Sequence, residues 1–262
     1  MRRKNTTSQI FDRIENKSVV IEVVAQIEDL ILSGVLREDD MLPGERALAE
    51  QFGVSRPKVR EALSLLGQSE LVRIVANDGV YIGKLGGEVM SPAMIELFNR
   101  SASAIRDNLE YRCENEGFAA RLAATRATDQ DRAELVRILE SLNEADKAKD
   151  IIRGSELDLE FHQSIAFAAH NRTLTHMMTA LYNLNRSSLF LNRAELFKIG
   201  NEAETLQQQH EDIVDSICRG KPALAEKAAQ THINYVATLM ETVFEQQSRE
   251  SVSNKRYRQT RG

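Results

Sequence analysis

The sequence is poor in the residues that build disulfide scaffolds and all-β folds. Its 262 residues include 2 cysteines, 4 prolines, 13 glycines and no tryptophan, and aromatic residues make up only 5%. Cys113 and Cys218 lie far apart and in no Cys-x-x-Cys pair, which excludes a disulfide framework or a thiolate zinc module and favours a reducing compartment. The scarcity of glycine and aromatic residues argues against a β-sandwich or barrel, which needs many turns and strands.

Long apolar runs are also lacking. No run approaches the ~20 residues that a membrane-spanning helix needs, and no apolar stretch follows the basic start Met1–Lys4. We therefore expect no membrane association, no export signal and a cytoplasmic location. The net charge is −5, and the negative charge is concentrated in residues 85–248, so any affinity for nucleic acid must come from a local basic patch.

The pattern of the chain indicates two domains, as its length suggests. Residues 1–84 mix short helices with one pair of strands, and the Gly- and Pro-containing residues 85–92 are typical of a linker. Residues 93–247 show helical periodicity almost throughout, which predicts an all-α antiparallel bundle. Residues 248–262 are polar, basic and aperiodic, and we expect a disordered tail. The predicted fold class is mainly α.

The N-terminal domain is predicted to be a winged helix-turn-helix. One helix is expected between Ser18 and Gly34, a second over Glu45–Phe52, and a third that begins after Ser55. A tight glycine-containing turn between the second and third helices is typical of the helix-turn-helix. Two β-rich runs separated by Asn77-Asp78-Gly79 predict a hairpin, or wing.

Three cationic residues gather at the start of the third helix. Arg56, Lys58 and Arg60 avoid its apolar stripe, and cations at this end oppose the helix dipole by ~0.3–1 kcal/mol each. Stability does not explain them, whereas DNA does, because recognition helices present their N-terminal residues to the major groove, where Arg reads guanine. The Ser55 hydroxyl and the neighbouring N–H groups suit a phosphate. The alternative is a solvated basic face on a structural helix.

Polar side chains recur at interior positions of three predicted bundle helices. Asp158 and His162 are four residues apart beside one apolar stripe, and His210 and His232 fall on the stripes of two later helices. Bundle cores commonly build metal sites from such positions, and one carboxylate with three imidazoles suits Zn, Ni, Fe or Mn. An octahedral ion would keep two positions open for a carboxylate effector. Taken singly, a histidine on an apolar face is usually a satisfied core residue.

The N-terminal domain carries a family resemblance. The runs LPGERALA (42–49) and VSRPKVREAL (54–63) resemble the DNA-binding domain of GntR-family bacterial transcription regulators. The resemblance implies a double-stranded, pseudo-palindromic DNA operator and a homodimer. The DNA-contacting positions that it implies are Arg46, Ser55, Arg56, Lys58, Arg60 and the wing-tip residue Gly79. Two departures are Ser69-Glu70, where the family often has Asp-Gly, and Asn77-Asp78 in a wing that is usually basic.

The helical domain resembles the FadR-type C-terminal (FCD) domain. Its opening helix has the family's pattern, with Arg112 and Glu116 followed by two Ala-Ala pairs. The resemblance implies that Asp158, His162, His210 and His232 form the metal-binding quartet of the metal-containing branch, and that the effector is a small organic or sugar acid. Arg112 lies on an inward stripe and is a candidate partner for the effector carboxylate. The alternative is an internal ion pair with Glu116.

These features together predict a DNA-binding regulator, most simply a repressor, and not an enzyme. An effector at the metal would draw together the helices over 154–169, 201–219 and 222–245 and change the spacing of two recognition helices on DNA. Three alternatives use the same Asp/His site: a metal-dependent hydrolase, a sensor of the metal ion itself, and a metal that only stabilises the bundle.

Overall fold

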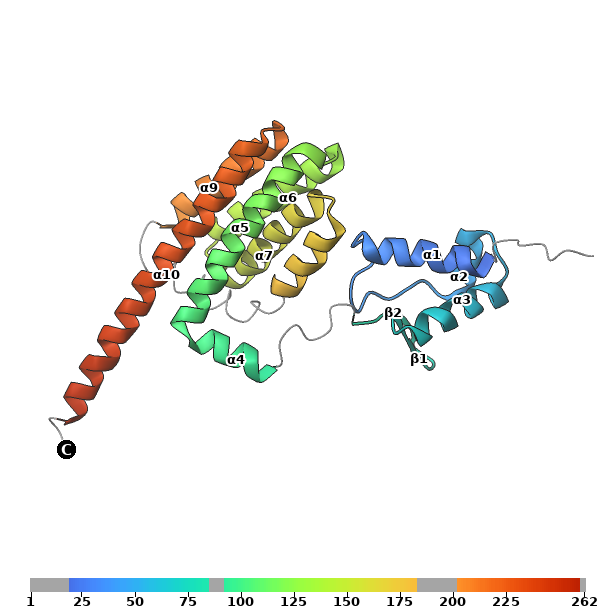
Figure 1. Ribbon diagram of the computed structural model, residues 1–262, viewed down its shortest axis with the longest axis horizontal. Coiled ribbons are helices and arrows are strands. Elements are labelled where there is room, and N and C mark those ends of the chain that lie inside the picture. The colour runs from blue at the N-terminus through green and yellow to red at the C-terminus, as the bar shows by residue number, and fades with distance from the viewer. Residues whose placement is uncertain (1–18, 85–91, 183–201, 260–262) are drawn as a thin grey trace, which may run out of the picture. The chain divides into compact units, whose positions relative to one another are not determined.

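The computed structural model describes residues 19–84, 92–182 and 202–259. The chain divides into two compact units between residues 85 and 86 (Figure 1). No helix in the described part of the chain is long and apolar enough to cross a membrane.

The N-terminal unit contains three helices and a hairpin. Its elements are α1 (Val19–Leu32), α2 (Glu45–Phe52), α3 (Arg56–Gln68), β1 (Val72–Val75) and β2 (Gly79–Ile82). The strands are antiparallel, with Val72 opposite Ile82 and Val75 opposite Gly79. The apolar stripes of α1 and α3 meet in one core, whose members include Val20, Val23, Ile27, Val59, Leu63 and Leu66. The winged helix-turn-helix prediction is therefore confirmed.

The turn between α2 and α3 depends on Gly53. Its φ of 65° is left-handed, and its N–H closes the end of α2 on the carbonyls of Ala49 and Glu50. Glycine adopts this conformation without the strain that a β-carbon introduces. The tight turn sets α3 across α2, so that the start of α3 is exposed.

The C-terminal unit is an all-helical bundle. Its elements are α4 (Pro92–Arg100), α5 (Ala102–Arg126), α6 (Asp129–Lys147), α7 (Ile151–Ala168), a helix over 172–182, α9 (Glu202–Cys218) and α10 (Pro222–Gln259). Helix α5 packs along α10 and α7, while α6 packs against α7. Small residues of α5, including Ala119, Ala120 and Ala123, allow this close packing in the main core. The inward faces of α5, α7, α9 and α10 thus line the interior of the bundle.

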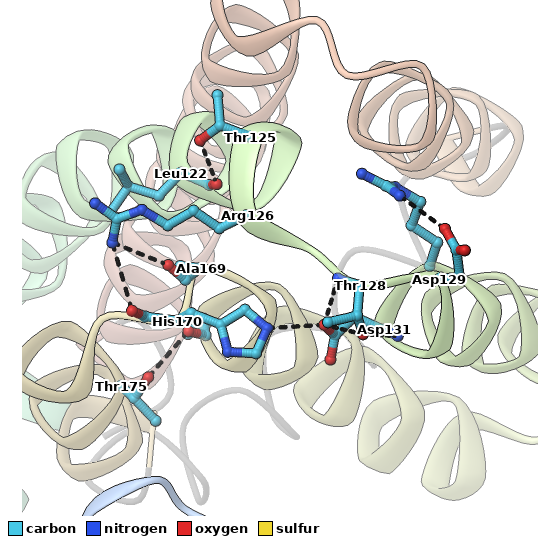
Figure 2. Close-up of polar contacts among 11 residues, drawn as sticks. Leu122, Thr125, Arg126, Thr128, Asp129, Asp131, Ala169, His170 and Thr175 are labelled. Carbon is cyan, nitrogen blue, oxygen red and sulfur yellow. Dashed lines mark hydrogen bonds and ion pairs between the residues drawn. The ribbon is translucent and has the colours of Figure 1, made fainter.

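Polar contacts tie three helix ends together (Figure 2). Thr128 and Asp131 form a reciprocal capping box at the start of α6, and the His170 Nε2 lies 2.8 Å from the Asp131 carboxylate. Arg126, at the end of α5, donates to the carbonyls of Ala169 and His170 that follow α7. These contacts fix the end of the bundle where α5, α6 and α7 meet.

Two sequence-based expectations are wrong. Residues 248–259 are not a disordered tail, because α10 continues to Gln259. This part of α10 is a solvated extension with side-chain pairs four residues apart, such as Glu245 with Arg249, which stabilise a helix without an apolar stripe. Helix α7 begins at Ile151 behind an Asp150 cap, and not at residue 154. The expected cap at Ser18 lies outside the described residues.

Candidate functional sites

The start of α3 exposes its cationic side chains. The side chains of Arg56, Lys58 and Arg60 are 60%, 48% and 66% exposed. Ser55 occupies the N-cap position, and its side chain makes no capping hydrogen bond to α3. Arg46 lies on the preceding helix and is 84% exposed. Four of the predicted DNA-contacting side chains thus come from two adjacent helices of one unit.

Glu45 links the arginines of α3 to α2, a contact that the sequence did not reveal. Arg60 donates to both Glu45 carboxylate oxygens, at 2.9 and 2.6 Å, and the Arg56 Nη2 lies 3.8 Å from the same carboxylate. The hydrogen bond from Arg60 is the main cause that lowers the pKa of Glu45. The carboxylate therefore orients two of the three cationic groups at the start of α3.

The wing is a short hairpin with Gly79 just after its turn. Gly79 is the first residue of β2, and a β-carbon there would lie 2.8 Å from the Met41 side chain. Arg73 packs over the Tyr81 ring at 5.1 Å, and the Tyr81 hydroxyl donates to Asp78. This hydrogen bond is the main cause that raises the pKa of Tyr81. Gly79 thus supports the packing of the wing.

Three histidines meet inside the bundle. His162 of α7, His210 of α9 and His232 of α10 offer ligand atoms that all lie within 4.8 Å of one another. All three are buried, and the Nε2 atoms of His210 and His232 are 3.2 Å apart. Nitrogens that each lie about 2.1 Å from one ion are about 3.0–3.4 Å apart. The pair of nitrogens therefore fits adjacent positions on a common metal ion.

Asp158 lies at the rim of this cluster. Its side chain is 20% exposed, and its Oδ1 lies 3.7 Å from the His210 Nε2. Asp158 is one helical turn before His162 on α7, which explains their common direction. The structure thus brings all four predicted ligand residues together, and their oxygen and nitrogen donors suit a borderline divalent ion.

A buried chain of charged groups adjoins the histidines. Arg112 donates to Glu116 at 2.8 Å, and the other carboxylate oxygen of Glu116 lies 2.7 Å from the His162 Nδ1. Burial alone would raise the pKa of Glu116, but the Arg112 charge and the contact with His162 outweigh it and hold this pKa at about 2. The internal ion pair considered for Arg112 is therefore present.

Tyr182 closes this side of the site. Arg112 lies 5.7 Å from the centre of its ring. Burial, followed by the nearby Glu116 carboxylate, raises the pKa of Tyr182. Within the described part of the chain, no group has hydrogen-bond geometry with the Tyr182 hydroxyl. A buried hydroxyl of this kind is a candidate donor for a polar ligand.

A side chain beside the histidine cluster also contacts the His232 ring. Its Nδ1 lies 3.2 Å from the Gln209 side-chain oxygen. Neither Gln209 nor Tyr182 was predicted from the sequence, and Glu116 was considered only as a partner of Arg112. The helical period shows which residues face inward, but it does not show which residues of different helices meet.

The fold and these sites define a class of protein. A winged helix-turn-helix with exposed arginines, joined to a helical domain with a buried polar centre, is typical of a ligand-responsive DNA-binding regulator. Residues 20–82 match the model of the bacterial regulatory proteins of the gntR family, and residues 107–235 match that of the FCD domain. The chain belongs to the GntR family and is a DNA-binding transcription regulator, not an enzyme.

Relatives with similar sequences match most of the chain. The Glc operon transcriptional activator of Escherichia coli (strain K12) is 30% identical over 226 residues, which are 85% of this chain and 89% of that protein. The HTH-type transcriptional regulator LutR of Bacillus subtilis (strain 168) is 31% identical over 219 residues, 83% and 99% of the two chains. The putative L-lactate dehydrogenase operon regulatory protein of Escherichia coli (strain K12) is 30% identical over 242 residues, 87% and 88% of the two chains.

A solved structure shares the fold. Streptococcus agalactiae GntR matches 84% of this chain and 99% of its own, with a TM-score of 0.51 and 23% sequence identity. The relatives and the fold are those of transcription regulators, so the hydrolase alternative is not supported.

Proposed function

We propose that this regulator binds a pseudo-palindromic operator as a homodimer and that a small carboxylate, bound at a metal centre in the helical domain, controls its affinity for DNA. The observation that carries the proposal is the cluster of three buried histidines from three helices, with a buried arginine one step away through Glu116. Such a centre has no evident role in DNA contact itself, but it suits a ligand that changes helix packing.

The DNA contacts are assigned to the exposed side of α2 and α3. Arg56 and Arg60 are placed to read guanine edges in the major groove, because their guanidinium groups lie at the exposed start of the recognition helix. Phosphate contacts, which fix the register of a protein on DNA, are assigned to Arg46, Ser55, Lys58 and the wing at Gly79.

The metal centre is assigned to Asp158, His162, His210 and His232. A bound Zn, Ni, Fe or Mn ion would supply a Lewis-acidic centre for carboxylate oxygens. The Nε of Arg112 donates to Glu116, and the guanidinium group has two further nitrogens with which to hold a carboxylate. The name of one relative refers to L-lactate dehydrogenase, an enzyme of a small hydroxy acid, which supports an acid of this size as the effector.

Regulation requires that the effector bind two arrangements of the dimer with different affinity. The groups that would hold it lie on α5, α7, α9 and α10, so its binding favours one packing of these helices. Two recognition helices must match half-sites separated by about one turn of DNA. A change in helix packing that alters their separation weakens the operator complex, which makes repression relieved by the acid the simplest scheme.

The first test replaces Arg56 with Ala. Specific binding to promoter fragments from its own gene region should fall at least about 100-fold, because a bidentate guanine contact and a phosphate-steering charge are both lost. Fluorescence anisotropy measures the affinity, and elemental analysis should show an unchanged metal content. Arg219→Ala, which removes an exposed, ion-paired arginine of the helical domain, is the matched control. Operator binding that survives in the Arg56 variant contradicts the assignment.

The second test concerns the effector. Operator affinity is measured with the ion restored, in the presence and absence of small hydroxy and keto acids. At least one acid should change the affinity by about 5- to 150-fold, the usual range of allosteric coupling. A response to chelator alone, with no response to any acid, would instead identify a metal-ion sensor.

A further inference from the structure

The imidazole ring has two nitrogens, and only the one without hydrogen can bind an ion. In a neutral histidine, the partner of one nitrogen decides which nitrogen is left with its lone pair. The described structure supplies such partners for two rings of the cluster: Glu116 faces the Nδ1 of His162 at 2.7 Å, and Gln209 faces the Nδ1 of His232 at 3.2 Å. Both partners place an acceptor oxygen within hydrogen-bond distance of Nδ1. The Gln209 contact also has hydrogen-bond geometry, whereas the Glu116 contact with His162 is short but off line, and a small rotation of either side chain would align it.

We propose that Glu116 and Gln209 are positioning residues that fix the Nδ1–H tautomers of His162 and His232 and thereby leave Nε2 of both rings ready to bind the ion. This inference rests on the metal centre of the proposed function. For His232 the consequence is visible, because its Nε2 is the atom that lies 3.2 Å from the Nε2 of His210.

The two positioning residues differ in charge and in support. Glu116 is 5% exposed, and Arg112 holds its second oxygen at 2.8 Å. An anionic acceptor orients the ring and makes its other nitrogen a stronger ligand. Gln209 is neutral and half-buried on α9, next in sequence to His210. The same helix therefore supplies one proposed ligand and orients another from α10.

Arg112 gains a second role through this arrangement. Its ion pair with Glu116 keeps the carboxylate charged and aligned toward His162 within the buried site. A carboxylate ligand that competes for Arg112 therefore acts on the same group that orients a proposed metal ligand. Binding of the acid and binding of the ion are then coupled, and the coupling is equal in both directions.

The test measures the zinc affinity of the purified full-length protein by competition with a chromogenic chelator. Gln209→Ala should weaken zinc binding about 10- to 100-fold, the usual cost of losing an outer-shell partner. Gln209→Glu should restore wild-type affinity or exceed it, because a carboxylate accepts the Nδ1 hydrogen more strongly. Gln208→Ala, an exposed neighbour that pairs with Asp212 on the same helix, is the control and should leave the affinity unchanged.

Glu116→Ala provides the second arm, because it removes the acceptor oxygen altogether, with the exposed Glu114→Ala of the same helix as its control. Nitrogen NMR of labelled histidine rings in the metal-free protein should show the Nδ1–H form of His162 and His232 in the wild type. Gln209→Ala should lose this form only at His232, and Glu116→Ala only at His162. A merely structural role would not change the tautomer of one ring alone.

The outcomes separate the two proposals. If the wild-type protein does not bind zinc or any of the other three ions, the proposed metal centre fails, and this inference fails with it. If the wild type binds zinc but Gln209→Ala and Glu116→Ala retain its affinity within twofold and its tautomers, the positioning role is overturned while the metal centre stands. If Glu116→Ala does not fold, the Gln209 pair decides the question.

Discussion

Asp131 shows how one side chain can serve several helices. It completes the capping box of α6 with Thr128 and receives the His170 ring from the turn after α7. Burial tends to raise the pKa of Asp131, but hydrogen bonds from Thr128 and the contact with His170 lower it overall. The ionised carboxylate is therefore the form that this junction stabilises (Figure 2).

We expect Asp131→Asn to lower the free energy of unfolding by about 1 kcal/mol at neutral pH, the usual cost of a lost helix cap. The folded-state pKa of Asp131 lies below its ordinary value of 3.8, so the carboxylate contributes stability that is present above that value. This contribution is lost as the pH falls through the lower folded-state pKa. Urea unfolding of both proteins across this pH range measures the difference.

Asp129→Asn is the control for this prediction. Asp129 is in the same first turn, where it also interacts with the helix dipole, but its side chain is fully exposed and forms a surface ion pair with Arg132. Equal losses in the two variants, or a loss for Asp131→Asn that persists at low pH, would show that the cap contributes nothing specific.

Single residues were predicted correctly where the helical periodicity of apolar positions within one helix places them. The spacing of Asp158 and His162, and the place of His210 and His232 on apolar stripes, indicated an interior polar cluster, and the structure brings these residues together. Gln209 and the contact of Glu116 with His162 were missed, because their partners lie on other helices. The sequence period defines the face of a helix but not its rotation and height against a neighbour.

At the scale of elements, α2 and α3 are joined by charge as well as by the Gly53 turn. Glu45 opens α2 and holds Arg60, and at longer range Arg56, at the start of α3. The carboxylate keeps these arginines from extending freely, and it carries the sign of charge that DNA phosphates repel. Glu45 therefore orients the arginines of the recognition helix and reduces the electrostatic attraction of this surface to DNA of any sequence.

Glu45→Gln should raise affinity for random duplex DNA about two- to fivefold, since exposed ion pairs are worth ~0.2–1 kcal/mol. Operator affinity should rise less, because the arginines lose their fixed orientation, so the ratio of specific to random binding falls. Anisotropy titrations with operator and scrambled duplexes at several salt concentrations measure this ratio. Glu22→Gln, which changes an exposed carboxylate of α1, makes the same change in net charge, and an equal effect from it would exclude a local role for Glu45.

The elements with local signals were predicted correctly. Glycine at the end of α2 and the Asn-Asp-Gly turn of the wing specify their conformations within a few residues, and both are present. The last part of α10 was not predicted, because it lacks an apolar stripe. Extending an existing helix requires no new nucleation, so polar residues can continue it as far as Gln259.

At the scale of the whole molecule, two units each have their own hydrophobic core. The proposed ligands of the metal ion all belong to the helical unit. An ion that binds only the folded state stabilises that state by about 2.7 kcal/mol at a concentration 100 times its dissociation constant. The ion is therefore expected to stabilise one unit and not the other.

Calorimetry of the full chain should show this selectivity. Chelator treatment should lower the melting temperature of the transition assigned to the helical unit by several degrees and leave that of the DNA-binding unit unchanged. The two transitions are assigned with His232→Ala, which should resemble the chelated protein and respond no further to chelator. Equal shifts of both transitions, or none, would contradict a metal centre confined to the bundle.

The histidine cluster also sets an order of events during synthesis of the protein. His162, His210 and His232 are contributed by α7, α9 and α10, and the last of them is residue 232 of 262. A ribosome must therefore translate the chain as far as residue 232 before the third imidazole exists, and α10 must leave the exit tunnel before it can join the others. The DNA-binding unit, which is encoded first, is free to fold long before the chain can respond to anything that binds at the cluster.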